Sequence, residues 1–302
     1  MPVALTILFR SAANEGRAFS FATARRRVNA VPLVAIPPAL RVMILKADSS
    51  WHGVLNDAMQ AVATADPAYL DALMRDDYLP TRGRLLAAFA QPFDAVQYVL
   101  VGEGPYPREA SATGFCFMDG AVDGLWSASG LSKTVNRATS LRNFIKMLLV
   151  ADGALQPDVT TGAVLGEIGS AALAAPSERT QTLPALQHAM TREGFLLLNA
   201  SLVFRASVAP VKDAKAWLPF LQTVLLALAQ RNAPPLLILW GKIAAQIDAL
   251  PGLQALPWIS AEHPYNLSFI RHCGMHALFG PMALLRQRSL SPAPLRNAES
   301  LM

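Results

Sequence analysis

The chain has 302 residues and a mass of 32.4 kDa, which suits one large α/β domain or two small ones. Hydrophobic residues make up 53% and charged residues 16%, so a disordered chain is excluded, and every apolar run ends before the ~18 residues that a membrane span needs. Two cysteines, Cys116 and Cys273, are too few for a disulfide framework, a four-cysteine zinc site or an iron–sulfur cluster. A globular cytoplasmic protein, with no membrane contact, is expected.

Charge is unevenly distributed along the chain. Residues 1–47 hold seven basic residues and one acidic residue, so they carry +6 while the whole chain carries +5. The remaining residues therefore sum to −1, and any anion-binding surface on them must use local donors rather than a general positive field. Residues 1–47 are predicted to form a flexible basic arm because they mix Arg, Ala, Ser and Pro and lack a secretory signal. Translation from Met43 is an alternative explanation of the arm.

Helical periodicity begins after Ser49 and Ser50, two good N-cap residues, and continues to Val62. Further helices are predicted over 82–90 and 212–230, with a shorter one after Gly241. The segment 152–182 is rich in Ala, Gly, Thr and Ser, and it is predicted to be an insertion with one short helix.

Four short apolar runs separate these helical segments, at 96–101, 194–198, 236–240 and 256–260. Continuous apolar runs of this length are typical of parallel strands that are covered on both faces. The alternation of strands and helices therefore predicts an α/β fold, a three-layer α/β/α sandwich around a central four-stranded, mainly parallel sheet.

Polar and aromatic residues follow the ends of the predicted strands, where open parallel sheets bind ligands. The residues at these ends are Glu103, Tyr106, Phe115, Phe117, Asn199, Lys242 and His263. An acid, an aromatic pair, an amide and a histidine are thus expected to meet at one edge of the sheet.

Six short segments occur in one order along the chain, at 102–107, 114–117, 138–143, 196–199, 239–241 and 263–268. Together they resemble the motifs of the uracil-DNA glycosylase superfamily, most closely its common single-domain branch. That branch reads Gly-Gln-Asp-Pro-Tyr-His, Gly-Leu-Cys/Ala-Phe, Pro-Pro-Ser-Leu-x-Asn, Leu-Leu-Leu-Asn, Leu-Trp-Gly and His-Pro-Ser-Pro-Leu-Ser. No single motif is decisive, but six in order argue against chance, and the resemblance covers residues 50–285. A glycosylase-like domain over 48–302 is expected.

The resemblance implies a DNA repair enzyme that flips uracil out of DNA and hydrolyses its N-glycosidic bond without a metal or organic cofactor. Phe117 would stack on the base and Asn199 would pair with its N3–H and O4 edge. Tyr106 would exclude the methyl group of thymine, and His263 would stabilise the departing uracil. DNA contacts would come from Ser140, Leu267 and Ser268, the serines at phosphates and the leucine as a wedge in the base stack.

The chain departs from the family pattern in its first motif. Gly104 stands where the family has its catalytic Asp, Pro107 replaces a His, and Glu103 replaces a Gln. Gly-Glu-Gly-Pro is similar to the Gly-Glu-Ala-Pro of the iron–sulfur branch, yet the cluster cysteines of that branch are missing. Glu103 is a candidate catalytic base, although it could equally bond loop amides or be solvated. The segments near 120–138 and 152–182 are longer than in the compact family version.

Three functions follow from this pattern. The first is a monomeric, monofunctional glycosylase that releases free uracil from single- or double-stranded DNA. The second is a catalytically silent protein that binds uracil-containing, abasic or damaged DNA, and the third is a glycosylase for a different base. Retention of Tyr106, Phe117, Asn199 and His263 favours the first, whereas Gly104 and Pro107 favour the second.

Overall fold

The central sheet consists of four strands in the computed structural model, which describes residues 35–287. They are β1 (Tyr98–Gly102), β4 (Phe195–Asn199), β5 (Leu236–Trp240) and β6 (Trp258–Ala261). The order is β4-β1-β5-β6, and every neighbouring pair is parallel. The predicted four-stranded sheet is confirmed, with all its strands in the predicted apolar runs or one residue beyond them.

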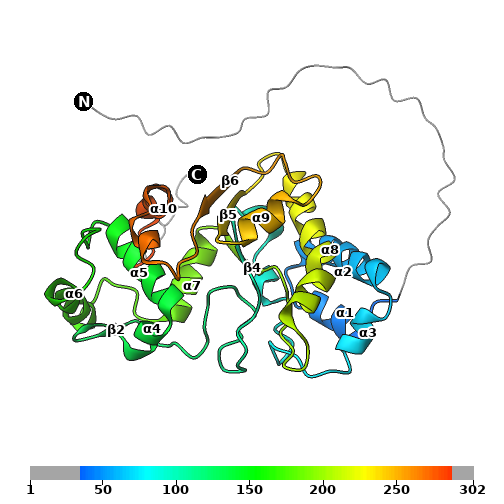
Figure 1. Ribbon diagram of the computed structural model, residues 1–302, viewed down its shortest axis with the longest axis horizontal. Coiled ribbons are helices and arrows are strands. Elements are labelled where there is room, and N and C mark those ends of the chain that lie inside the picture. Colours follow the sequence, from blue (N-terminus) through cyan, green and yellow to red (C-terminus); the bar gives the residue numbers. More distant parts are fainter. Residues whose placement is uncertain (1–34, 288–302) are drawn as a thin grey trace, which may run out of the picture.

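Helices cover both faces of this sheet (Figure 1). One face carries α1 (Pro38–Ile44), α2 (His52–Ala65), α3 (Tyr69–Leu73), α8 (Pro210–Ala229) and α9 (Ile243–Asp248). The other side carries α4 (Lys133–Arg137), α5 (Thr139–Ala151), α6 (Ala163–Leu173), α7 (Leu183–Arg192) and α10 (Cys273–Phe279). This is the predicted α/β/α sandwich.

Two hydrophobic cores explain why the strands read as unbroken apolar runs. Val99 and Val101 of β1 face the core that contains α2 and α8, whereas Leu100 between them faces the core that contains α5 and α7. Side chains alternate across a strand, so a strand between two cores must be apolar at every position.

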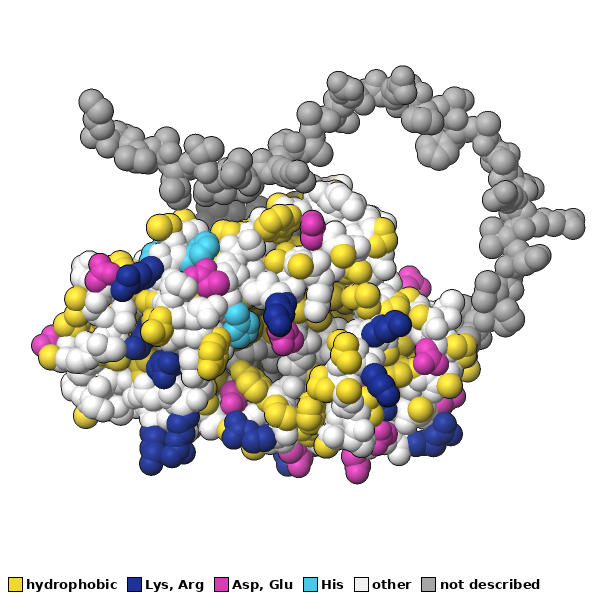
Figure 2. Space-filling view, viewed as in Figure 1, with side chains coloured by type: hydrophobic (Ala, Val, Ile, Leu, Met, Phe, Trp, Pro, Cys, Tyr) yellow, Lys and Arg dark blue, Asp and Glu magenta, His cyan; other side chains and the backbone are white. Residues whose placement is uncertain are grey.

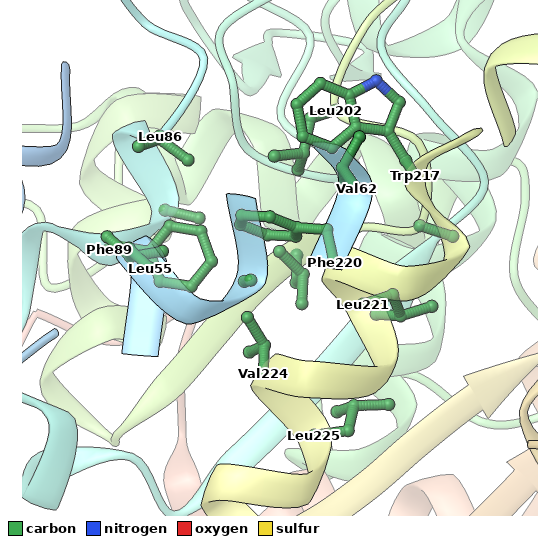
Figure 3. Packing of buried hydrophobic residues seen from close by; sticks show 14 of the residues in the cluster. Leu55, Val62, Leu86, Phe89, Leu202, Trp217, Phe220, Leu221, Val224 and Leu225 are labelled. Atoms are coloured by element: carbon green, nitrogen blue, oxygen red, sulfur yellow. The ribbon is translucent and has the colours of Figure 1, made fainter. Parts of the chain in front are cut away.

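The core beside α2 and α8 is rich in aromatic side chains (Figure 3). Phe220 of α8 lies between Trp217 and Phe89, with ring centroids 5.4 Å and 6.0 Å away in edge-to-face arrangements. Leu55 and Val62 of α2 complete the contact and are fully or almost fully buried. This packing fixes α8, whose first turn lies beside the functional edge of the sheet.

Two of the predicted boundaries are wrong. The arm was placed at 1–47, but α1 buries Leu40 and Ile44 in the core, so residues 35–47 belong to the folded domain and residues 1–34 lie outside the described part. A start at Met43 would remove Leu40 from that core. Neither serine is the N-cap of α2: both lie in the 3₁₀ turn Ser49–Trp51 that leads into it, and the N-cap of that turn is Asp48, whose carboxylate accepts the Ser50 N–H at 3.0 Å.

The helix predicted over 82–90 is also wrong. Only a short 3₁₀ turn, Ala87–Ala90, forms there. Arg82 and Gly83 have φ values of 60° and 69°, and two successive left-handed residues cannot continue a right-handed helix.

The two segments predicted as insertions pack against each other. The first forms a small hairpin of β2 (Trp126–Ser127) and β3 (Gly130–Leu131), followed by α4. The second contains α6, which confirms the predicted short helix, and Ser170 of α6 donates to the Ala128 carbonyl at 3.0 Å. No helix within residues 35–287 has the length and apolar character to cross a membrane.

Candidate active site

A pocket of about 200 Å³ lies at the carboxyl ends of β1, β4 and β5. Six of the eight residues singled out as site residues line it, namely Glu103, Tyr106, Phe117, Ser140, Asn199 and His263. The other two, Leu267 and Ser268, lie outside the pocket in the exposed turn that follows His263. The structure therefore brings six of the predicted site residues together and leaves the two predicted DNA contacts of this turn at the rim.

Asn199 ends β4 directly opposite Gly102 of β1. Its side chain is 3% exposed, and no side-chain hydrogen bond is formed to it by any residue between 35 and 287. Its amide atoms are not among the enclosed unpaired polar atoms of residues 35–287, so they open into the pocket and are available to the edge of a ligand. Glycine is required opposite it, because a Cβ on Gly102 would lie 3.0 Å from Asn199 Oδ1 and 2.7 Å from Cys116 Cβ.

Phe117 occupies a strained backbone position at the pocket wall. Its φ is +61°, a value that bulky residues rarely adopt. The ring packs edge-to-face on Trp240 with centroids 4.8 Å apart, and it lies 5.8 Å from the His263 ring at an interplanar angle of 33°. Strain of this kind persists where the surroundings over-determine it, and it holds one face of the Phe117 ring toward the pocket.

His263 is held as a neutral imidazole with its proton on Nε2. Nδ1 accepts the Tyr265 backbone N–H at 3.1 Å, so Nδ1 carries no proton. Burial lowers the pKa of His263 below its ordinary value, and the nearby charge of Glu103 only partly opposes this. The pocket therefore contains a donating Nε2–H rather than a cation. Gly241, at a φ of +65°, allows the end of β5 to approach, since a Cβ there would lie 3.0 Å from His263 Cβ.

Asn143 of α5 holds the His263 loop in place, a role that the sequence did not reveal. It is completely buried, and its Nδ2 donates to the Pro264 carbonyl at 2.8 Å and to the Tyr265 carbonyl at 3.3 Å. An amide among the mostly apolar buried residues of α5 was the available signal, because a buried amide needs partners. The partners come from a loop 121 residues further along the chain, which no local pattern specifies.

Burial raises the pKa of two further side chains at the site, Tyr106 and Cys116. Burial raises the pKa of the Tyr106 phenol, so it stays protonated and acts as a bulky wall. Burial likewise raises the pKa of the Cys116 thiol, which donates to the Leu100 carbonyl at 3.2 Å. The prediction that Cys116 is a small buried residue is confirmed.

The backbone conformation at position 104 does not require glycine. Its φ is not in the left-handed region, and a Cβ there would meet only Ser201, at an ordinary 3.6 Å. The carboxylate of Glu103, next to it, is exposed, and its main-chain oxygen accepts the Ser201 N–H at 3.1 Å. A side chain is thus sterically allowed at position 104.

A general positive field does not surround the pocket. Figure 2 shows basic side chains scattered over the visible face with acidic ones among them, as the near-neutral charge of residues 48–302 implies. No group of three or more His, Cys, Asp or Glu side chains in the described part of the chain is arranged to hold a metal ion.

An α/β/α fold with an aromatic wall, an unpaired buried amide and a donating imidazole at the strand ends defines a protein that recognises a planar polar ring. No family model matches the chain. The uracil-DNA glycosylase of Corynebacterium glutamicum is 28% identical over 229 residues, covering 75% of this chain and 83% of that protein. The uracil-DNA glycosylase of Thermobifida fusca is 29% identical over 257 residues, covering 82% and 93% respectively.

Similarity to a solved structure is stronger. The crystal structure of wild-type UNG from Nitratifractor salsuginis is 36% identical, with a TM-score of 0.74, and the match covers 82% of this chain and 96% of that one. The chain therefore belongs to the uracil-DNA glycosylase family, and the fold that the sequence resemblance implied is confirmed.

Proposed function

We propose that this protein is a DNA repair enzyme that excises uracil from DNA and leaves an abasic site. The observation that carries the proposal is the pairing of a buried, unpartnered Asn199 amide with a neutral His263 donor across one aromatic pocket. An amide offers one donor and one acceptor, which match the O4 and N3–H of uracil. Family membership supports DNA as the partner.

The reaction follows from these groups. The flipped base stacks on Phe117 while Asn199 reads its edge, and the C1′–N1 bond breaks as the electron pair moves onto the base. The Nε2–H of His263 bonds the O2 oxygen, where negative charge develops, and this stabilises the leaving anion. Water adds to C1′ and loses its proton, uracil takes up a proton, and the products are free uracil and an abasic sugar. The scheme requires no metal or organic cofactor.

On the sugar side of the reaction, this chain lacks the carboxylate that the family pattern places at position 104. Gly104 has no carboxylate to face the sugar cation, and Glu103 is the nearest acidic residue of the pocket wall. Glu103 is proposed to orient water or stabilise the cation, together with the DNA phosphates themselves. Ser140, in the first turn of α5 at the pocket, and Ser268 at the rim are proposed as phosphate contacts. The exposed Leu267, also at the rim, is proposed as the wedge in the base stack.

A monomer in the cytoplasm is part of the same proposal. Cys116 and Cys273 are unpaired, which suits a reducing compartment. A second candidate function, a silent reader of uracil-containing or damaged DNA, is favoured by one observation, the missing carboxylate at Gly104.

A single-turnover assay separates the two functions. The protein is mixed in excess with labelled single- and double-stranded oligonucleotides that contain one uracil, and abasic sites are revealed by alkaline cleavage. Strand cleavage at the uracil is expected, and a thymine-containing oligonucleotide of the same sequence should stay intact. Tight binding without base release would reject the enzyme and support the reader.

A further inference from the structure

A second cleft, of about 450 Å³, lies beside the base pocket. The two cavities share Glu103 and Gly104 as a common wall. The rest of the cleft is formed by Pro105 and Pro107, by the segment 201–204 that follows β4, and by the first turns of α8 and α9. Its volume falls in the range of small-molecule sites, whereas the base pocket has room for little more than one ring.

Gly104 places no side chain in the wall that separates the two cavities. A Cβ at this position would point toward Ser201, 3.6 Å from both its Cβ and its carbonyl oxygen, and Ser201 itself lines the second cleft. A longer side chain at 104 would therefore stand in the wall between the two cavities. The residue that removes the family's carboxylate also opens the path between the two cavities.

The lining of the cleft has the chemistry of a nucleotide site. Pro107, Phe204 and Val211 present apolar surface, and the Val211 side chain is 73% exposed. The exposed Lys242 contributes an ammonium group and Gln246 a neutral amide. Apolar and aromatic surfaces accept the face of any base, and an ammonium group attracts a phosphate. Glu103, the acidic residue of the cleft, lies in the wall shared with the base pocket.

We propose that this cleft binds the nucleotide next to the flipped one on the same DNA strand, with its base against Pro107, Phe204 and Val211. The inference rests on the proposed function for the identity of the strand. It adds a base-contacting subsite that recognises an unstacked neighbour, so single-stranded DNA is the substrate that fills both cavities. In a duplex the neighbouring base would have to leave its own stack first.

The test compares three single-stranded oligonucleotides with one uracil each. One is intact, and in the other two a tetrahydrofuran spacer replaces the 5′ or the 3′ neighbouring base. Loss of the base that occupies the cleft is expected to lower kcat/KM about tenfold, within the range for one stacked base, and loss of the other base should change it little.

Val211→Trp fills the cleft without touching the base pocket. It should lower kcat/KM on the intact oligonucleotide by the same factor. On the oligonucleotide that already lacks the stacked base, it should cause no further decrease in kcat/KM. Val42→Trp, at a 56% exposed valine of α1, is the matched control and should change no rate. Thermal melting shows whether either variant is folded. If Val211→Trp does not fold, Lys242→Gln replaces it and should reduce the salt slope of binding by about one.

Two outcomes overturn the subsite. In one, neither spacer changes kcat/KM. In the other, Val211→Trp lowers kcat/KM by the same factor on all three oligonucleotides. The same oligonucleotides with a 2′-fluorinated deoxyuridine, whose sugar cation is destabilised, provide a fluorescence anisotropy assay that needs no catalysis. Spacer-dependent binding by a protein that releases no uracil would reject the proposed function and leave the subsite standing.

Discussion

The two sides of the base pocket are built differently. On the base-reading side, Asn199 is buried at a strand end, Phe117 is fixed in a strained backbone conformation, and the tautomer of His263 is set by a backbone bond. On the sugar side, Glu103 is exposed and Gly104 has no side chain. The base-reading side is thus preorganised, whereas the acidic side chain on the sugar side is not fixed by packing. Selectivity and hydrolytic rate are expected to respond separately to mutation.

The largest effect is expected from the base-reading side. Asn199→Ala should lower the single-turnover rate of uracil release about 10³-fold, because a site built to bond a polar edge loses much when that bond is removed. DNA affinity, measured by anisotropy, should change less than about threefold since phosphate contacts dominate it. Asn56→Ala, at an exposed asparagine of α2, is the control. Equal loss of rate and affinity would show that Asn199 does not read the base.

His263 is expected to rank second. His263→Ala should slow uracil release about 10²-fold through the loss of one donor to the leaving oxygen, with DNA affinity nearly constant. The exposed His188 of α7 offers a matched control, and its replacement by Ala should leave the rate unchanged. A comparable loss of DNA affinity would assign His263 to the DNA interface instead.

The pH dependence of the reaction tests the protonation state of His263. Because burial lowers its pKa below 6.5, the imidazole is neutral above that pH, and the rate should be flat from pH 7 upward. Below the lowered pKa the ring gains a proton on Nδ1 and loses the bond from Tyr265, so both activity and the stabilising effect of the neutral ring fall as the pH decreases. His263→Ala should abolish this acid limb. A limb centred above pH 7 would contradict the neutral donor.

The sequence was informative about the base-reading side for a physical reason. Continuous apolar runs locate parallel strands, and ligands bind where such strands end, so Asn199 and His263 could be placed together from the sequence alone. Its failures have local causes as well. The helix predicted over 82–90 does not form because Arg82 adopts a left-handed conformation. The support that Asn143 gives to the His263 loop depends on a contact between residues that are distant in the sequence. Neither the cleft beside Gly104 nor the strain at Phe117 leaves a periodic signal.

A smaller effect, of opposite sign, is expected on the sugar side. Gly104→Asp should raise the rate of uracil release about tenfold, because a carboxylate would face the developing sugar cation and the backbone accepts a Cβ without a clash. Gly104→Asn has the same size without the charge, and it should give no gain. A folded Asp variant with an unchanged rate would indicate that the chain uses another group, and Glu103→Gln would then be the next variant to measure.

The smallest effect concerns the choice of base. Tyr106 lines the pocket as a protonated, half-buried phenol, and a pocket without space for one methyl group rejects it by ~1–3 kcal/mol. Tyr106→Ala should therefore raise the rate of thymine release about 10-fold to 100-fold, to a detectable level, while uracil release falls only a few-fold. Tyr265→Ala removes the ring of a 68% exposed tyrosine outside the pocket, so it should not release thymine. The measurement is alkaline cleavage of a thymine-containing oligonucleotide after long incubation. If thymine stays bound in DNA while uracil is still excised, the methyl group is rejected by a part of the pocket other than Tyr106, and the base-reading side owes its selectivity to Asn199 and the stacking wall alone.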